Sequence, residues 1–582
     1  MSTMNTGQVS LAEQHLHNDG CFLPEGSSRE RWIALLLFVV SCLYLRLFYD
    51  YTKLNGDEGI VLQGAQRILQ GQVLYRDFFS FFTPGSYYWM ALLFKIFGSS
   101  ILVGRAALIV YGGLFSVLTY LLARRVCSRW SALLAAYFVT LTCLPYRFLV
   151  LHNWDSTLWA YLALYGAVLW LERGHWGWAL ATGSFTALTF LFEQSKGAGL
   201  LLGLGVGFSV IVWRGRFRSW LGPRQLTGVA AGLGWPWVVT LSYFVMKHSL
   251  REMLTDWVWP LFHYSVANKL PYGYLVTSTP DGAELLAGSW LFRLLMLIVM
   301  GPCLLLPVVP LLALGILAWL ALKRSRSEHR SGKWTYGVLV SATLAGLLLA
   351  TFLTKRPDFT HLNYLAPLFY LVVAWVLDGL NVPSHLWRSL KPLLVLGIFL
   401  SFTAFGMAML WGPLGARHTF RTARGTIRTG DPDFALEYVQ AHVTPGEKIL
   451  VYPYQPLYYY LTATFSPTRF DFLQPGMHTP DQFQGATREV LADRTRVVLL
   501  ETSFREKCSV GWPNTPPQVI AARDPVEDYI FAHYRPCTAL AANAFWHFVF
   551  MVHKDGSCPP GESGATSRCL VSEVCACATA RE

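Results

Sequence analysis

The sequence predicts an all-α polytopic membrane protein that carries a small α/β region near its C-terminal end. Three observations support this fold class. Of the 582 residues, 53% are hydrophobic and only 14% are charged, which is unlike a soluble domain. Apolar runs recur between Trp32 and Trp411 with the length, roughly 20 residues, that a helix needs to cross a bilayer. Beyond Trp411, helix and strand signals alternate instead.

Eleven apolar runs are expected to cross the membrane as helices. They cover residues 32–50, 101–123, 130–149, 156–171, 176–192, 197–213, 225–246, 290–322, 335–353, 362–380 and 391–411. No small-residue cleavage site follows the first run, so we expect it to remain as the first helix. The expected regions are a cytoplasmic segment (1–31), a transmembrane domain (32–411), an extracytoplasmic α/β domain (412–555) and a disordered cysteine-containing tail (556–582).

The apolar segment from Pro84 to Gly98 is expected to lie flat in the first outer loop. It is too short for a comfortable crossing, and its Pro-Gly start and Tyr-Tyr-Trp cluster are typical of an interfacial helix. If it lies flat, four basic loops fall on the side of the N-terminus, as cytoplasmic loops should. These loops contain RRVCSR, RGRFRSWLGPR, KRSRSEHRSGK and SHLWRSLK. The formal charge of +12 therefore reflects orientation in a membrane, and no nucleic-acid partner is expected.

This topology gathers several polar connections on the outer face. They are the first loop with Asp57 and Glu58, then Arg147 to Ser156, Glu193 to Gly197, and Thr354 to Tyr364. The long loop from Lys247 to Ser289 joins them and is rich in Trp and Tyr. Most of that loop is expected to be an ordinary interfacial belt, although aromatic rings also stack on sugars and line grooves for lipid tails.

Two adjacent carboxylates, Asp57 and Glu58, follow the first membrane helix in the stretch NGDEG. Acidic groups so close to hydrocarbon are costly, so they indicate a catalytic pair with a general base. Their hard oxygen atoms also suit a divalent cation such as Mg²⁺ or Mn²⁺. The structural alternative is that Asp57 N-caps a short helix over residues 59–70, with Glu58 in its first turn. The stretch that follows, as far as Phe78, is expected to form an amphipathic helix resting on the interface.

Two basic residues on the outer face are candidates for binding an anionic group of the substrate. Lys196 lies where a helix enters the membrane from outside, followed by Gly197 and Gly199, an arrangement that favours a phosphate ligand. The alternatives are a snorkelling lysine or an ion pair with Glu193. Arg356 is basic on the side where basic residues are disfavoured, which indicates anion binding.

Four further polar residues are predicted to contribute to substrate binding. His152 and Asp155 lie in the short loop LHNWDS, and Asp358 and His361 lie in KRPDFTHLNY. The alternative for each is an ordinary solvated loop residue.

The 11 cysteines show no metal-ligand spacing. Cys42, Cys143 and Cys303 lie in apolar runs and are expected to be inert. Because the outer side of the membrane is an oxidising compartment, Cys508 and Cys537 are predicted to form a disulfide.

These motifs resemble those of the polytopic glycosyltransferases that use polyprenyl-phosphate sugars, a superfamily that includes the lipid A aminoarabinose transferase and the protein O-mannosyltransferases. The similarity lies in GDEG, in TPGSYYWMALLFKIFG followed by Arg105, in QSKGAG and in RPDFTHLNYLAPLFY. Where the aminoarabinose transferase has a Lys before its Pro pair, this chain has Thr83-Pro84-Gly85, so one phosphate contact is missing. The resemblance implies a GT-C-like fold.

The resemblance also implies transfer of a sugar from a polyprenyl-phosphate donor to a glycan, lipid or protein acceptor at the outer face of the inner membrane. Phosphate leaves without a strong acid, so the site needs a base and cations. Asp57 would be the base, and Lys196 with Arg356 would bind the phosphate. Single displacement would invert the anomeric centre. Glu58 or Asp155 would hold the divalent cation or position the acceptor.

Two other classes of protein are weighed against this enzyme. A transporter or lipid-linked sugar flippase usually holds its substrate near the bilayer midplane with charges inside helices, whereas these polar groups cluster at one surface. A non-catalytic scaffold would leave the acidic outer loop unexplained. The sequence therefore favours the glycosyltransferase.

Overall fold

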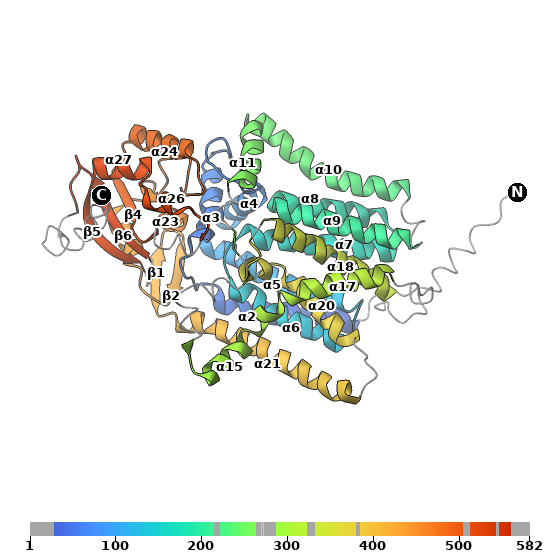
Figure 1. Cartoon of the computed structure of the whole chain (residues 1–582). Coiled ribbons are helices and arrows are strands. Elements are labelled where there is room, and N and C mark those ends of the chain that lie inside the picture. The colour runs from blue at the N-terminus through green and yellow to red at the C-terminus, as the bar shows by residue number, and fades with distance from the viewer. Residues whose placement is uncertain are drawn as a thin grey trace.

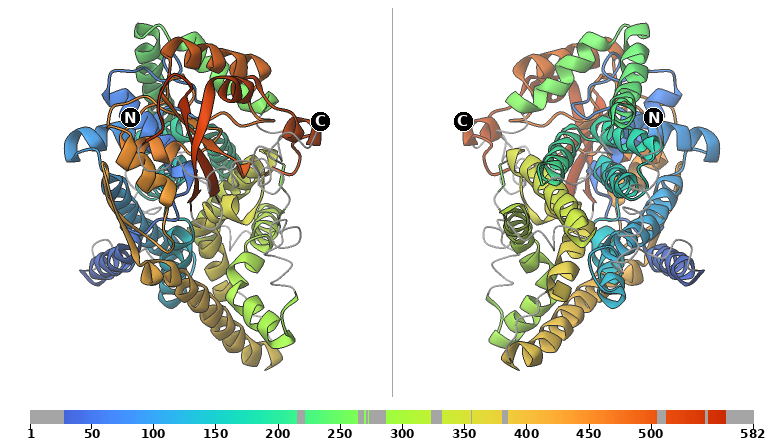
Figure 2. Two further views of the ribbon diagram at one scale, coloured as in Figure 1. Left: turned by 90° about the vertical axis from the view of Figure 1, so that its left-hand side faces the viewer. Right: turned by 90° about the vertical axis from the view of Figure 1, so that its right-hand side faces the viewer.

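A computed structural model describes residues 28–214, 222–263, 269–270, 272, 287–322, 332–354, 356–379, 385–504, 512–542 and 546–559. Long helices form a bundle, and a smaller region of helices and strands covers one end of it (Figure 1). Seen from that end, the strands lie in front of the helices (Figure 2). The arrangement confirms the predicted fold class.

Helices lie in all eleven ranges predicted to span the membrane. Ten of these ranges correspond to α2 (Ser28–Leu45), α5 (Ile101–Ala123), α6 (Arg129–Tyr146), α7 (His152–Arg173), α8 (Trp176–Phe192), α9 (Gln194–Trp213), α10 (Pro223–Met246), α18 (Gly332–Leu353), α20 (Ala366–Gly379) and α21 (His385–Gly415). Within the described residues, six helices are long and apolar enough to cross a membrane by themselves. They are α2, α5, α9, α10, α18 and α21.

The run at 290–322, expected to be one helix, is divided into three. These are α15 (Trp290–Val299), α16 (Gly301–Leu305) and α17 (Val308–Leu322). Pro302 and Pro307 lie at the two breaks, and proline lacks the N–H group that a continuous helix requires. The helix α15 packs along α21 at the edge of the bundle (Figure 1).

The outer surface of the bundle is strongly apolar. Leu36, Val238, Leu311 and Leu393 are each at least 62% exposed, and many neighbours on the same helices are similar. A soluble protein rarely exposes so much contiguous apolar surface, whereas lipid chains cover it without cost. Inside the bundle, glycines bring α9 and α18 close together. A Cβ atom at Gly199 would lie 2.6 Å from the carbonyl oxygen of Gly346.

The first outer loop contains two helices, α3 (Gly56–Leu69) and α4 (Gly85–Phe97). The 13-residue α4 is about 20 Å long, too short to cross a bilayer, and it exposes Ile96 and Phe97 on one side. The stretch expected to rest on the interface is instead the buried α3, which ends at Leu69. A Cβ atom at Gly59 would come within 2.0 Å of the backbone nitrogen of Leu457, so that interfacial prediction is wrong.

The N-cap of α3 is Asn55 rather than Asp57. The Asn55 side chain accepts a hydrogen bond from the backbone N–H of Asp57 at 2.9 Å. Asp57 and Glu58 both lie in the first turn, where the helix dipole favours negative charge. The alternative that Asp57 serves only as the N-cap of this helix is therefore wrong. The Asp57 side chain is available for other contacts.

After α21 the chain forms a two-stranded hairpin and a four-stranded sheet. The hairpin pairs β1 (His418–Thr422) with β2 (Gly425–Thr429). The sheet has the order β3-β4-β6-β5, in which β3 and β4 are parallel and the other pairs antiparallel. Its strands are β3 (Leu450–Tyr452), β4 (Val497–Glu501), β5 (Tyr534–Ala542) and β6 (Trp546–His553). All five residues of β4 are buried.

Short helices accompany the sheet and the bundle. Beside the sheet are α22 (Phe434–His442), α23 (Pro456–Thr462), α24 (Pro480–Asp493), α26 (Pro517–Ala521) and α27 (Pro525–His533). Beside the bundle are a 3₁₀ turn (Arg46–Phe48), α11 (Leu250–Phe262) and α19 (Phe359–Asn363). Cys537 is bridged to Cys558, so the predicted partner Cys508, which lies outside the described residues, was wrong. The bridge ties residue 558, assigned to the disordered tail, to β5.

The C-terminal sheet region shares buried core with the bundle instead of hanging from it. Arg428 of β2 pairs with Asp50 at 2.8 Å, and the backbone N–H of Ile101 donates to the carbonyl of Arg424 at 3.0 Å. One continuous apolar core includes Leu62 of α3 and Leu457 of α23. Residues on either side of Trp411 are therefore joined by packing as well as by the chain.

A buried ion pair fixes α3 against α5. Arg105 donates to both carboxylate oxygens of Glu58, at 3.1 and 2.6 Å, and both side chains are fully buried. The same guanidinium donates to the carbonyl of Tyr51, and the backbone N–H of Val150 donates to Glu58 at 3.2 Å. The pair thus links the end of the first membrane helix, α3, α5 and the segment after α6.

We expect Arg105→Met to lower stability by about 3–5 kcal/mol, because it leaves the Glu58 carboxylate buried without a cation. Glu58→Gln together with Arg105→Met should recover part of the loss. Arg76→Met, which removes a pair with Asp77 at the surface, is the control and should have a much smaller effect. Melting of the purified variants in detergent measures the difference; equal melting of Arg105→Met and Arg76→Met would contradict the assignment.

Candidate active site

Asp57 lies where the bundle meets the C-terminal sheet region. One carboxylate oxygen accepts a hydrogen bond from the guanidinium of Arg147, and the other accepts one from the hydroxyl of Tyr454. The Asp57 side chain is 39% exposed, in contrast to the fully buried Glu58 beside it. Two partners from distant parts of the chain therefore orient a carboxylate that solvent or a substrate can still reach.

Glu58 does not offer a free carboxylate to a substrate. Both of its oxygens are bonded to Arg105, and its side chain has no exposed surface. The structure therefore corrects the expected catalytic role of Glu58: this residue supports the helix that presents Asp57.

Arg147 follows the last residue of α6 and faces several acidic groups. Besides its ion pair with Asp57, its guanidinium lies within electrostatic reach of Asp358 and of the Tyr364 hydroxyl. Its Nε atom is buried and has no hydrogen-bond partner among the described residues. Arg147 thus connects the first outer loop to the loop before α19, and one of its donors remains for another acceptor.

Lys196, the predicted phosphate ligand, is already surrounded by protein acceptors. Its ammonium donates to the carbonyl of Asn153 and to the hydroxyls of Ser156 and Thr157 at 2.8 to 3.0 Å. It also pairs with Glu193 at 3.0 Å, and its side chain is only 6% exposed. An ammonium has three protons to donate, so this one has none left for phosphate. The pairing with Glu193 was the alternative expected from the sequence.

His152 and Asp155, both predicted to bind substrate, face different surroundings. The His152 ring is half-buried and lies against Phe82, with ring centroids 4.1 Å apart. Asp155 is buried and accepts a hydrogen bond from the Ser86 hydroxyl at 2.6 Å, which fixes α7 to α4. His152 therefore borders the candidate site, whereas Asp155 is a buried link between helices.

Arg356, Asp358 and His361 form one cluster, as their predicted shared role requires. Asp358 caps α19 and accepts from the backbone and the ring Nδ1 of His361 at 2.9 and 2.8 Å. Arg356 Nε donates to the same carboxylate at 3.1 Å. Burial alone would raise the pKa of Asp358, but His361 and Arg356 hold that pKa well below its usual value. The carboxylate is thus ionised and offsets part of the positive charge.

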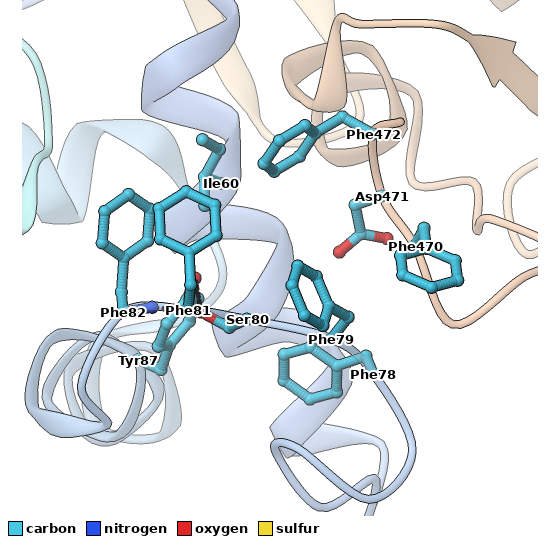
Figure 3. Close-up of a pocket in the computed structure, with 10 residues that line it drawn as sticks. All are labelled: Ile60, Phe78, Phe79, Ser80, Phe81, Phe82, Tyr87, Phe470, Asp471 and Phe472. Atoms are coloured by element: carbon cyan, nitrogen blue, oxygen red, sulfur yellow. Dashed lines mark hydrogen bonds between the residues drawn. The ribbon is translucent and has the colours of Figure 1, made fainter. Parts of the chain in front are cut away.

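A narrow aromatic pocket opens beside this polar centre (Figure 3). Its wall combines the loop before α4, the face of α3 and a segment of the C-terminal sheet region. The lining residues are Ile60, Phe78, Phe79, Ser80, Phe81, Phe82, Tyr87, Phe470, Asp471 and Phe472. Phe82 also touches His152, so the aromatic pocket and the polar centre are neighbours.

The predicted cation site at Asp57 and Glu58 does not fit the geometry. Arg105 occupies both oxygens of Glu58, and Arg147 with Tyr454 occupies those of Asp57. Among the described residues, no cluster of three or more His, Cys, Asp or Glu side chains could hold a metal ion. A divalent cation needs several free oxygen ligands, which these two carboxylates do not provide.

Two residues of the site were missed by reasoning from the sequence. Arg147 carries the same signal that singled out Arg356, since it is basic on the outer face, and it could have been found in this way. Tyr454 carries no such signal, because it is separated from Asp57 by 397 residues and only the fold brings them together.

Comparison with known proteins supports a class for the chain. Residues 83–245 match the family model described as dolichyl-phosphate-mannose-protein mannosyltransferase. This segment contains α4 to α10 and the resemblance motifs TPGSYYWM and QSKGAG. None of the curated proteins compared with the chain matches it.

Two solved structures are similar to this chain. The crystal structure of the Archaeoglobus fulgidus oligosaccharyltransferase in complex with Zn and sulfate aligns over 87% of this chain and 79% of its own, with a TM-score of 0.52 and 13% identity. ArnT from Cupriavidus metallidurans bound to undecaprenyl phosphate aligns over 92% of this chain and 98% of its own, with a TM-score of 0.42 and 14% identity. The family-model match supports the predicted class, a multi-pass membrane glycosyltransferase, and gives no support to a transporter. The likeness to the first of these structures shows the fold.

We expect Lys196→Met to act on stability, because it strands the buried Glu193 carboxylate without its cation. The expected loss is about 3–5 kcal/mol, and Glu193→Gln in the same chain should restore part of it. Melting in detergent, measured for both single variants and the double variant, checks this. A Lys196→Met protein that melts like the wild type but binds a lipid phosphate less tightly would instead make Lys196 a phosphate ligand.

Proposed function

We propose that this chain transfers a sugar from a polyprenyl-phosphate donor to an acceptor hydroxyl or amine, with Asp57 as the general base. The observation that carries the proposal is the geometry of Asp57. Its carboxylate is oriented by Arg147 and Tyr454, is 39% exposed, and lies between the polar outer loops and the aromatic pocket. The description of the family model that matches residues 83–245 includes a donor of this kind, dolichyl-phosphate-mannose.

The reaction needs little acid catalysis, since a phosphate is a good leaving group. The acceptor O–H or N–H would attack the anomeric carbon as the bond to the phosphate oxygen breaks. Asp57 would take the acceptor proton in the same step, and the phosphate would leave with the electron pair of the broken bond. One such displacement inverts the anomeric centre.

The cations that would balance the departing phosphate are Arg147 and Arg356. Arg147 has a buried Nε donor for which the described part of the chain supplies no partner, and Arg356 is the basic residue of the neighbouring cluster. Guanidinium groups suit phosphate oxygens because their donors lie in one plane. His152, His361 and Asp358 would position the donor beside them. Lys196 acts one step away, by holding α7 and α9 together.

No step of this mechanism is routed through a divalent cation, because Arg105 engages both oxygens of the buried Glu58 and Asp57 alone does not provide the several oxygen ligands that such a cation needs. The Archaeoglobus oligosaccharyltransferase structure is a complex with Zn and sulfate, which is a statement about that protein. The proposed location is the inner membrane with the site facing outside. It is supported by the sequence, in which the predicted topology puts the four basic loops on the side of the N-terminus and Asp57 on the other side.

We expect Asp57→Asn to lower turnover on the order of 10²–10⁴-fold, because the amide keeps the shape of the side chain but cannot accept the proton. The assay is incubation of purified protein with a panel of radiolabelled polyprenyl-phosphate sugars, scoring loss of label from lipid. Stability should change little, since the ion pair that is lost is partly exposed.

The matched control for that experiment is Asp50→Asn. Asp50 also pairs with an arginine, Arg428, at the outer end of the bundle, with a similar exposed fraction of 31%. The partner of the Asp50 side chain is Arg428, which is not a residue of the candidate site. The turnover of the Asp50→Asn protein should therefore match that of the wild type. Full activity in Asp57→Asn, with label lost from any donor, would remove Asp57 as the base.

The proposed orientation makes a second prediction. Reporter fusions at Gly332, at the start of α18, and at Gly446, beside the sheet, should report opposite compartments, with Gly446 outside. The reason is that the topology predicted from the sequence puts the four basic loops, and Gly332 with them, on the side of the N-terminus. Both fusions reporting one compartment would refute the arrangement of spanning helices.

A further inference from the structure

The tip of the hairpin formed by β1 and β2 rests on the first turn of a membrane helix. The carbonyl of Arg424 accepts hydrogen bonds from the backbone N–H of Ile101 and from the Ser100 hydroxyl, both at 3.0 Å. Gly425 follows with a φ of +119°, and a Cβ atom there would lie 2.8 Å from the Ser100 hydroxyl oxygen. The hairpin tip is therefore fitted closely against the start of α5.

This contact sets the depth of Arg424 relative to a bilayer. The helix α5 has 23 residues and is apolar enough to cross a membrane. Its length is about 35 Å, whereas the hydrocarbon layer is about 30 Å thick, so the ends of α5 reach the lipid headgroups. Because Arg424 is bonded to the first residue of α5, it lies at headgroup level.

The neighbour of Arg424 on this side is the short helix α4, which exposes apolar side chains. Ile96 and Phe97 at its end are 61% and 68% exposed. Phe94 on the same helix stacks on the ring of Tyr460, with 5.7 Å between centroids. The guanidinium of Arg424 lies over that same Tyr460 ring, 5.6 Å from its centroid. A cation and a lipid-facing apolar surface are thus joined through one tyrosine.

The Arg424 side chain has no acceptor among the residues that the structure describes. Its Nε atom is buried and unpaired, and the buried hydroxyl of Tyr460 likewise has no partner there. Burial lowers the pKa of Arg424, and the group that opposes this shift is the Tyr460 phenol rather than a carboxylate. The guanidinium keeps its charge at neutral pH. Two donors and a positive charge therefore lie together without an acceptor.

The other two arginines of the hairpin show what Arg424 lacks. Arg421 on β1 is exposed, so water solvates its charge. Arg428 on β2 pairs with Asp50 at 2.8 Å. Arg424 is half-buried and has neither full solvation nor a carboxylate. A partly desolvated cation without an anion is costly, and an anionic ligand would remove that cost.

We infer that Arg424 binds the phosphate group of a membrane lipid. A guanidinium presents its donors in one plane that matches two phosphate oxygens. The headgroup level of Arg424 places it where lipid phosphates lie, and Ile96 and Phe97 would pack against the lipid chain. Lys95, exposed beside Phe94 on α4, adds a second positive charge to this surface.

This inference goes beyond the proposed function and does not depend on it, since binding requires no sugar transfer. The lipid could come from two sources with the same chemistry, a bilayer phospholipid or an isoprenoid phosphate. A free anion fits less well, because it would gain nothing from the exposed apolar end of α4. A purely structural role, in which Arg424 only stacks on Tyr460, leaves the charge unbalanced.

Photolabelling of the purified full-length protein in neutral detergent tests the site and its occupant. The probes are phosphatidylglycerol, farnesyl phosphate and uncharged diacylglycerol, each with a diazirine near the head of its chain. We expect one or both phosphate lipids to label residues 92–98 at lower concentration than diacylglycerol does. For Arg424→Gln we expect about tenfold more of that lipid to be needed for half-maximal labelling. Labelling by diacylglycerol should not change.

The matched control is Arg421→Gln, which removes the same charge from the same hairpin at an exposed position. It should change half-maximal labelling by less than about twofold. Arg424→Lys keeps the charge but not the planar donors, so labelling should weaken by about threefold. The lysine variant and melting in detergent show whether a loss in Arg424→Gln reflects unfolding.

The lipid that loses labelling in Arg424→Gln identifies the source, and either phosphate lipid supports the inference. Unchanged labelling in Arg424→Gln, or an equal loss in Arg421→Gln, would overturn it. Inorganic phosphate that competes as well as the lipids do would also overturn it, by making this a site for free anions. Sugar transfer is scored separately, so a protein inactive toward every donor could still bind lipid phosphate at Arg424.

Discussion

The ion pair between Glu58 and Arg105 is the contact on which the geometry of the candidate site depends. It holds the first turn of α3 against α5, and that turn carries Asp57 one residue earlier. A buried pair of this kind adds little net stability over an apolar pair, but its loss is costly. The contribution of this ion pair is therefore to hold α3 in one position. If α3 rotated or shifted, Glu58 or Arg105 would be buried without its partner. The Asp57 carboxylate therefore keeps its orientation.

The second constraint comes from the C-terminal sheet region, which contributes side chains to the site. Tyr454 orients Asp57, and Phe472 closes the aromatic pocket. The close approach of α3 and α23 at Gly59 leaves no room for a larger residue between them. The two halves of the chain therefore behave as one structural unit at the place where the chemistry is proposed.

Sequence patterns predicted the helices well because a bilayer imposes a fixed length and an apolar composition on each of them. The prediction that Asp57, Lys196 and Arg356 share the outer face followed from the charges of the loops. The contacts between side chains that are distant in the sequence could not be predicted. Nothing local shows that Arg105 occupies Glu58, that Glu193 and the end of α7 saturate Lys196, or that Cys537 is bridged to Cys558. The burial of α3 was missed for the same reason, since its covering helix lies almost 400 residues later.

The position of Tyr454 has a consequence for the biosynthesis of the protein. A ribosome delivers α3 and its carboxylate early, whereas the phenol that orients this carboxylate emerges after the last membrane helix. Until the C-terminal residues have folded onto α3, a nascent chain holds an unoriented acid and an open pocket. Under the proposed function, activity would thus begin only once the whole polypeptide has been made, and a chain truncated after α21 would be inactive.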